Sequence, residues 1–501
     1  MIFYHAKYNQ NMGHLFEAIT RTAFFQIKSA AKRAKSEREH GGGGFAAMTL
    51  AAAFGAAAFL AAGCESTRAM AAGTRVVAGG GLAVRVGSGE NTETLRVAPP
   101  ELFHIATNFP APANLPDEAR EGYSWTGAAG FMPRYDSEDG SIILGGAFRQ
   151  TLPESVEIMS TNGALLFIEG RDFALNTEWG QFAAIDGRLG ASALQVKAAL
   201  AMQRIDLLQE DAAGKRSVKQ GISRLVCPRI PAPDEGCRAV AGIYVAPWRR
   251  GAVWTVTQDD IFPIRQRAAA DAAAGSKGGR KRAAAGIAKT RAKLEGGTPV
   301  TVAFVGDSIT LGAEAGRWWS DDSATFRGRV TRGLRERFPG AAVTEVQAFQ
   351  GGKGIEFVAE TFHEAVAPSC PDLIILGIGV NDAHEKTPGT DVPAVAPAAF
   401  EALFKKILVD SAEIGAEVIV LTSMQTNPFD ANGDAARWSA YLRIQRSLAA
   451  KHNAVLADTY AAWMDQALDG IPPFSQLHNW INHPGADGHK LFADTILRAF
   501  D

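Results

Sequence analysis

The sequence has little cysteine and almost no net charge, and each shortage excludes a class of protein. Four cysteines in 501 residues are too few for a disulfide-rich scaffold, and none stands at a spacing typical of zinc sites. The formal net charge is −2, and no basic stripe with interleaved aromatic residues is present, so we expect no nucleic-acid partner. The chain also lacks a Gly-x-Ser-x-Gly elbow and a phosphate-binding loop. At this length two or more domains are expected.

The N-terminus carries a pattern typical of an export signal. A basic segment precedes the uncharged run Phe45–Ala62, which ends in small residues followed by Gly63 and Cys64. Residues 60–64 resemble a bacterial lipobox, which implies that residues 1–63 are removed and that Cys64 is lipidated. The alternative is a transmembrane helix over the same run, which is near the lower length limit for spanning. Either interpretation predicts an exported chain held at the membrane of the cell envelope, on its periplasmic or cell-surface side.

Cys227 and Cys237 bracket a loop-like stretch that contains three prolines. In an oxidising compartment these two residues are candidates for a small disulfide loop. A metal site is the weaker alternative, because no histidine or second cysteine pair lies nearby.

Composition divides the chain before residue 297 into three further segments. Residues 64–98 are rich in Gly, Ala and Ser, which is typical of a flexible tether. Residues 99–264 contain short apolar or alternating runs separated by turn residues, which predict an all-β, sandwich-like accessory domain. Residues 265–296 are rich in alanine and basic side chains and predict a partly helical linker.

Several details of the β-like segment bear on function. The expected strands are Ser155–Met159, Ala164–Ile168, Gln181–Ile185, Ala193–Lys197 and Val240–Val245. Aromatic residues of this segment are candidates for a carbohydrate platform, with core packing as the alternative. They are Tyr123, Trp125, Tyr135, Trp179 and Trp248.

Strands and helices alternate over residues 297–501. The expected strands are Val300–Val305, Ala342–Ala348, Leu373–Ile378, Glu417–Thr422 and Ala454–Ala457. The expected helices are Phe326–Phe338, Ile355–Val366, Ala398–Ile414 and Ala435–His452. This alternation predicts βαβ units and a parallel five-stranded sheet in a flavodoxin-like, three-layer α/β/α sandwich.

Polar stretches follow three of the predicted strands, and a fourth lies near the C-terminus. The stretches are Gly306–Ile309, Gln350–Gly354, Gly379–Asp382 and Asn482–His489. Because parallel strands end at the same edge of a sheet, we expect the first three to meet there. Ser308 is a candidate nucleophile, and His483 can take its proton. The backbone N–H groups of Ser308 and Gly352 and the side-chain amide of Asn381 are candidate oxyanion donors.

These four stretches, in this order, resemble the SGNH (GDSL-type) hydrolases, which are named for Ser, Gly, Asn and His in four blocks. The resemblance covers about residues 298–501 and implies the same fold and an esterase that needs neither metal nor organic cofactor. Ile309 stands in place of the Leu usual in the first block. The departure that matters is Trp480, which stands where an Asp three residues before His483 is usual. Asp458, at the end of the fifth predicted strand, is a possible third triad member. The alternative is a Ser–His dyad.

The combined expectation is an exported, lipid-anchored serine esterase that acts on carboxylic esters, with O-acetyl groups on carbohydrate as the favoured substrate. Family resemblance leaves lipase, lysophospholipase and thioesterase activities open. A non-catalytic, glycan-binding envelope lipoprotein is the remaining alternative, and the missing Asp is its main support.

Overall fold

The structure is a computed structural model of the chain. It describes residues 75–88, 91–116, 125, 127–131, 147–190, 192–265, 285–387, 390–430 and 435–501. The run Phe45–Ala62, Cys64, Tyr123 and Tyr135 lie outside the described residues. Within those ranges, no helix has both the length and the apolar character needed to cross a membrane.

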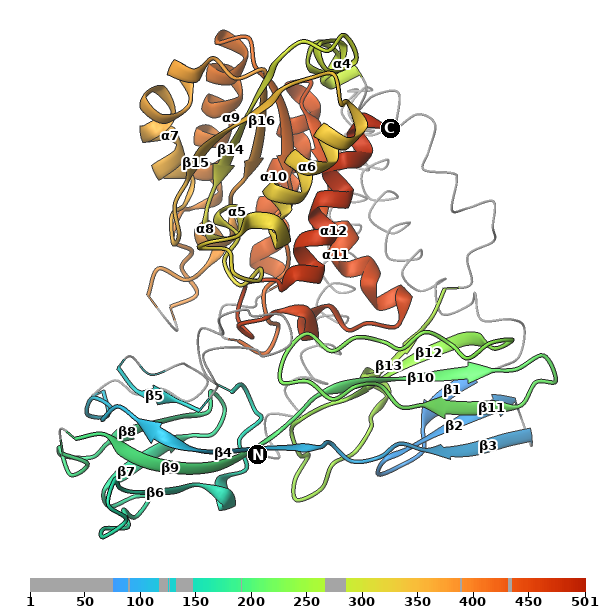
Figure 1. Cartoon of the computed structure of the whole chain (residues 1–501), viewed down its shortest axis with the longest axis vertical. Coiled ribbons are helices and arrows are strands. Elements are labelled where there is room, and N and C mark those ends of the chain that lie inside the picture. Colours follow the sequence, from blue (N-terminus) through green and yellow to red (C-terminus); the bar gives the residue numbers. More distant parts are fainter. Residues whose placement is uncertain are drawn as a thin grey trace, which may run out of the picture. The chain divides into compact units, whose positions relative to one another are not determined.

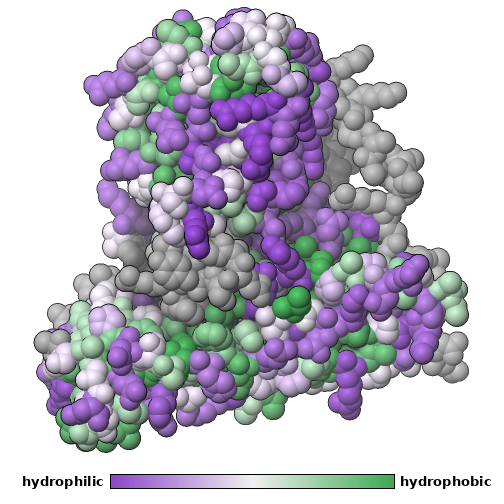
Figure 2. Space-filling model, viewed as in Figure 1, coloured by the Kyte–Doolittle hydropathy of each residue, from purple (hydrophilic) through white to green (hydrophobic). Residues whose placement is uncertain are grey.

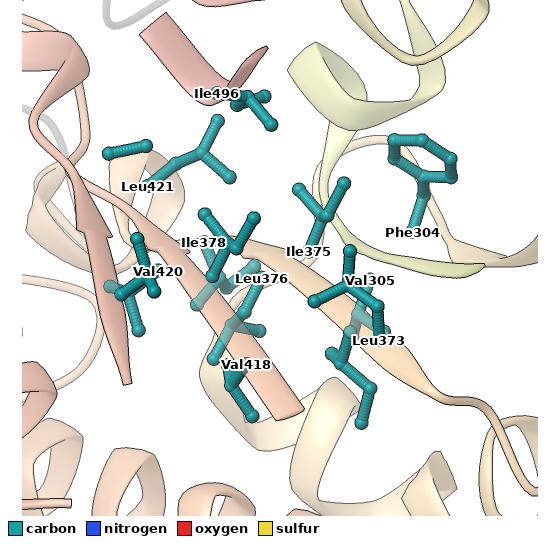
Figure 3. Packing of buried hydrophobic residues seen from close by; sticks show 14 of the residues in the cluster. Phe304, Val305, Leu373, Ile375, Leu376, Ile378, Val418, Val420, Leu421 and Ile496 are labelled. Carbon is teal, nitrogen blue, oxygen red and sulfur yellow. The ribbon is translucent and has the colours of Figure 1, made fainter. Parts of the chain in front are cut away.

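A five-stranded parallel sheet organises the C-terminal half of the chain (Figure 1). Its strands lie in the order β15-β14-β16-β17-β18, and every neighbouring pair is parallel. They are β14 (Val300–Gly306), β15 (Val343–Phe349), β16 (Leu373–Gly377), β17 (Glu417–Leu421) and β18 (Val455–Ala457). Strand β14 lies between β15 and β16, and it is apolar except for Thr301 because both of its faces are covered. Figure 3 shows Val305, Leu373, Leu376 and Val418 packed together in this core.

Helices pack in two groups around this sheet: α12 contacts both α6 and α11, and α9 contacts both α7 and α10. Their bounds are α6 (Phe326–Arg337), α7 (Ile355–Ala365), α9 (Pro397–Glu413), α10 (Ala435–Lys451), α11 (Thr459–Asp465) and α12 (Ala486–Leu497), with the shorter α4 (Ala288–Glu295), α5 (Ser308–Leu311) and α8 (Val380–Ala383). On the face in Figure 2, hydrophilic side chains gather over the helix-rich part, as expected for helices whose apolar sides contact a sheet. The predicted fold class is therefore confirmed.

The N-terminal part consists of small sheets, and all the strand pairs given for the three sheets between residues 102 and 263 are antiparallel. The sheets have the orders β4-β9-β6, β5-β8-β7, β11-β10-β12-β13 and β1-β2-β3. The strands are β1 (Arg75–Ala78), β2 (Ala83–Ser88), β3 (Asn91–Arg96), β4 (Leu102–Phe109), β5 (Ala129–Gly130), β6 (Glu157–Ser160), β7 (Phe173–Asn176), β8 (Gln181–Ala184), β9 (Leu194–Ala201), β10 (Arg204–Glu210), β11 (Arg216–Lys219), β12 (Arg238–Val245) and β13 (Ile261–Pro263). The predicted all-β character is confirmed.

Two expectations about local structure in this part are wrong. The predicted tether contains strands β1 to β3, because its valines alternate with polar residues and Val76, Val84 and Val86 are buried. The run Ala164–Ile168 forms no strand, and Leu165 and Leu166 are 61% and 63% exposed.

Two of the aromatic residues suggested as a carbohydrate platform are packing residues. Trp179 is 1% exposed, and its ring centroid lies 4.9 Å from that of Phe148. Trp248 packs against Phe429 and Phe474, at 5.7 and 6.3 Å between ring centroids.

The expected disulfide between Cys227 and Cys237 is also absent. Cys227 is buried, and its Sγ lies 3.4 Å from the carbonyl oxygen of Gln476, whereas Cys237 is only partly buried just before β12. Contact with the C-terminal part of the chain therefore takes the place of the disulfide at Cys227.

Candidate active site

Ser308 lies at the carboxyl edge of the sheet, two residues after the end of strand β14. Asp307 is the N-cap of α5, and its Oδ1 accepts a hydrogen bond from the Ile309 backbone N–H at 2.9 Å. Gly306 is needed at the strand end, because a Cβ there would lie 2.1 Å from the carbonyl oxygen of Gly377 in β16. This tight strand-to-helix turn presents Ser308 as the first residue of its helix.

Two buried carboxyl groups hold the loops around Ser308. Asp382 accepts a hydrogen bond from the Ile355 backbone N–H at 2.8 Å. A Cβ at Gly354 would lie 2.6 Å from the Asp382 Oδ1, so a side chain there would displace this carboxyl group. Burial raises the pKa of Asp307 to about 7 and that of Asp382 to about 6. Both groups act through backbone hydrogen bonds and so position the edge of the sheet.

His483 lies within hydrogen-bonding distance of the serine. Its Nε2 is 2.7 Å from the Ser308 Oγ, although the two residues are 175 positions apart in the sequence. Burial, together with repulsion from His384 and His478, lowers the pKa of His483 to about 4. The imidazole is therefore neutral at neutral pH, which a general base requires.

The two other predicted oxyanion residues lie on neighbouring loops. Asn381, in α8, donates from its Nδ2 to the carbonyl oxygen of Lys353 at 2.8 Å. Gly352 has a left-handed φ of +73°, which favours glycine. At the preceding residue, Gly351, a Cβ would lie 3.8 Å from the Ser308 Cβ, so this loop passes directly beside the serine. Ser308, His483, the glycine loop and Asn381 thus occupy one edge of the sheet.

Asp458 is not the partner of His483, and that expectation is wrong. Asp458 is the N-cap of α11, and its carboxylate accepts hydrogen bonds from the Thr422 hydroxyl at 3.0 Å and from the Arg446 Nε at 2.9 Å. Its position at the end of β18 suits helix capping and an ion pair.

The side chain that contacts the His483 Nδ1 belongs to Asn479, at 2.9 Å between Nδ2 and Nδ1. Asn479 also accepts three backbone hydrogen bonds at its Oδ1, from residues 481, 482 and 483. The sequence did not predict this residue, because the family pattern points to a carboxylate and the alternative was a Ser–His dyad. The signal in the sequence is an asparagine placed to form an Asx-turn just before the histidine.

Trp480 occupies the position where the family usually has an Asp, but its side chain points away from His483 and into a hydrophobic cluster. It is fully buried, belongs to the hydrophobic cluster of the β-rich part and lies 5.8 Å from the Phe148 ring. Its φ of +61° is left-handed, which is uncommon for a non-glycine residue. The chain therefore turns at Trp480 and leaves the Asn479 side chain beside His483.

A buried imidazole–carboxylate pair lies in the same part of the chain. His478 Nδ1 is 2.8 Å from the Glu314 Oε2, and both side chains are fully buried. His478 also pairs through its backbone N–H with the carbonyl oxygen of His483, at 2.7 Å. The sequence gave no indication of Glu314 as a partner of His478.

Comparison with known proteins places this domain in a family. Residues 304–491 match the model of the GDSL-like Lipase/Acylhydrolase family. No curated protein matches the chain. LAE5, an alpha/beta hydrolase enzyme from the metagenome of Lake Arreo, Spain, is 26% identical, with a TM-score of 0.34 and coverage of 40% of this chain and 94% of LAE5. Axe2, an acetylxylan esterase from Geobacillus stearothermophilus, is 21% identical, with a TM-score of 0.35 and the same two coverages.

The matched segment contains Ser308, Asn381 and His483, and it spans all five strands of the parallel sheet except the start of β14. The C-terminal α/β domain of this chain therefore carries the GDSL-like lipase/acylhydrolase match over residues 304–491, and the protein is a hydrolase of ester bonds.

Proposed function

We propose that the protein cleaves carboxylic esters through an acyl-enzyme on Ser308, with His483 as general base and then general acid. The observation that supports this most directly is the 2.7 Å contact between the Ser308 Oγ and the His483 Nε2 at the carboxyl edge of the sheet. Nucleophile and base within hydrogen-bonding distance are the signature of a serine hydrolase site.

The remaining groups have roles in the transition state. Ser308 attacks the ester carbonyl, its proton passes to His483, and the carbonyl oxygen becomes an oxyanion. The backbone N–H groups of Ser308 and Gly352 and the Asn381 Nδ2 would donate to this oxyanion. Asn381 is held by Lys353 in the structure, and a substrate oxyanion would compete for the same amide group. His483 then protonates the leaving alcohol, and water releases the acid by the reverse sequence.

The proposed substrate is a small ester, with O-acetyl groups on carbohydrate as the favoured class. The N-terminal sequence supports export and attachment through a lipid on Cys64, which would keep the enzyme among the polymers of the cell envelope. Trp179 is buried and the partly buried Trp248 packs against Phe429 and Phe474, so neither suits a glycan platform. Specificity for an acetylated glycan would then come from the hydrolase domain itself.

A substrate series tests this proposal. Purified full-length protein and the Ser308→Ala variant are assayed with p-nitrophenyl esters from acetate to dodecanoate, with acetylated xylan and with a lysophospholipid. Both proteins are also treated with a fluorophosphonate probe. We expect acetate to give the highest kcat/KM and the probe to label only the wild type. Preference for long chains would instead favour a lipase or lysophospholipase, and absence of labelling would favour a non-catalytic protein.

Attachment to the membrane is tested separately. The Cys64→Ser variant should move from the membrane fraction to the soluble fraction, because the lipid would be missing. Membrane retention of this variant would favour a spanning helix over residues 45–62.

A further inference from the structure

The amide group of Asn479 has only one orientation that satisfies its hydrogen bonds. Its Oδ1 receives three backbone N–H groups, from residues 481, 482 and 483, at 3.0, 3.0 and 2.9 Å. Exchange of the oxygen and nitrogen positions would place an NH₂ group, which cannot accept, against these three donors. The group that faces His483 is therefore the NH₂, and it donates to the His483 Nδ1 at 2.9 Å.

This contact determines where the neutral imidazole carries its proton. A neutral histidine has one protonated and one unprotonated ring nitrogen. Because Nδ1 accepts from Asn479, the proton lies on Nε2, the nitrogen 2.7 Å from the Ser308 Oγ. In this tautomer Nε2 donates to the serine and has no lone pair to receive the serine proton.

We propose that Asn479 is a positioning residue that holds His483 in the tautomer unable to act as a base, and thereby limits the rate of acylation. The inference rests on the proposed roles of Ser308 and His483. The productive tautomer and the imidazolium formed during attack both carry a proton on Nδ1, which would point at the Asn479 NH₂. Two donors then face each other in a buried site. This contact disfavours both the tautomer that must be present before the serine proton moves to Nε2 and the imidazolium that forms afterwards.

The substitution Asn479→Asp provides a direct test. One carboxylate oxygen can keep the three backbone hydrogen bonds, and the other can accept from a protonated Nδ1. The neighbouring Asn482 amide, whose Oδ1 now accepts from Asn479 Nδ2 at 3.1 Å, can turn to donate instead. The opposite change in a serine protease triad, Asp to Asn, costs about 10⁴ in kcat through the wrong tautomer. We expect Asn479→Asp to raise kcat for p-nitrophenyl acetate by about 10²-fold or more, with little change in KM.

Asn482→Asp is the matched control. It adds the same charge within one residue of His483, but the new carboxylate would accept from the Asn479 amide and leave the tautomer unchanged. We expect its kcat to stay within about threefold of the wild type. An equal rise in both variants would show that added charge is the cause, and would overturn the inference.

The tautomer can also be measured without any substrate. In protein labelled with ¹⁵N-histidine, ring shifts distinguish Nε2–H from Nδ1–H, and a His483→Gln variant identifies the His483 signals among the ten histidines. We expect Nε2–H in the wild type and in Asn482→Asp, and Nδ1–H in Asn479→Asp. An Nδ1–H wild-type tautomer would overturn the inference while leaving the proposed esterase intact. Failure of the proposed function looks different: Ser308→Ala added to Asn479→Asp would then leave turnover unchanged.

Discussion

Replacement of Trp480 by alanine should be one of the most destabilising changes in this chain. The Trp480 side chain is fully buried and shares a cluster with Phe148, Trp179 and Phe182. Truncation of a buried aromatic residue to alanine costs about 3–5 kcal/mol, from lost transfer free energy and from the cavity left behind. Because Trp480 has no exposed surface, we expect a loss near the upper end, about 4–5 kcal/mol.

Trp480→Phe is the matched control, because it keeps most of the apolar volume. The Trp480 Nε1 is buried and has no hydrogen-bond partner among the residues that the structure describes, and an unsatisfied buried donor costs about 1–3 kcal/mol. Phenylalanine removes this unsatisfied donor, and the resulting gain in stability offsets part of the cost of the small cavity that the substitution leaves. We therefore expect Trp480→Phe to lose no more than about 1 kcal/mol, since isolated changes of this kind lie in that range.

Urea unfolding followed by circular dichroism gives both values, and initial rates with p-nitrophenyl acetate test the effect on the site. Trp480 follows Asn479 directly, and its carbonyl oxygen accepts from the Asn427 Nδ2 at 2.7 Å. Loss of the indole should thus loosen the loop before His483 and lower kcat in Trp480→Ala. A loss of stability below about 1 kcal/mol in Trp480→Ala would refute the role of this side chain as a packing anchor.

Four further outcomes follow from the site. Ser308→Ala should lower kcat by about 10³-fold or more with folding intact, measured by p-nitrophenyl acetate turnover and circular dichroism. Asn381→Ala should lower kcat by about 10²–10³-fold with little change in KM, and a change in KM alone would make Asn381 a substrate-binding residue. Asp458→Asn should lower kcat by less than about tenfold, because its carboxylate caps a helix; a thousandfold loss would contradict this. Since His483 has its pKa lowered to about 4, kcat/KM should stay level from neutral pH down to about pH 5 and fall as the imidazole is protonated below that; an acid limb near pH 6.5 would contradict the shielding.

The parallel sheet was predictable because its signals are local and repeated. Each strand is a short apolar run and each helix has the period of an amphipathic helix, so the observed β14 and α6 differ from expectation by one residue at one end. The N-terminal strands were harder, because β10 contains Arg204 and Asp206, which form a fully buried ion pair. A strand that contains charged residues is expected to be exposed. Its burial here is explained by the ion pair between Arg204 and Asp206, which the sequence alone does not reveal.

The site was predictable where its residues follow strands, and unpredictable where a loop decides which side chain faces the ring. Ser308 and Asn381 follow β14 and β16 closely, so the topology alone brings them to one edge. The partner of His483 depends on the backbone between 478 and 483, where one left-handed residue changes which side chain points inward. The asparagine at 479 indicates an Asx-turn, but the residue types alone do not place Trp480 in the left-handed region.

Trp480 and Asn479 together explain why this site lacks the usual carboxylate. A side chain at 480 can serve either the imidazole or the hydrophobic cluster that contains Phe148, because the left-handed turn sends it away from His483. With tryptophan at that position, the turn is stabilised by burial in the β-rich part, and the side chain one residue earlier reaches the Nδ1. That residue is an asparagine with its oxygen already committed to three backbone N–H groups. Trp480 therefore sets the packing of this loop against the β-rich part, and the adjacent Asn479 contacts the Nδ1 of His483. A substitution at either position should change the rate at which Ser308 reacts.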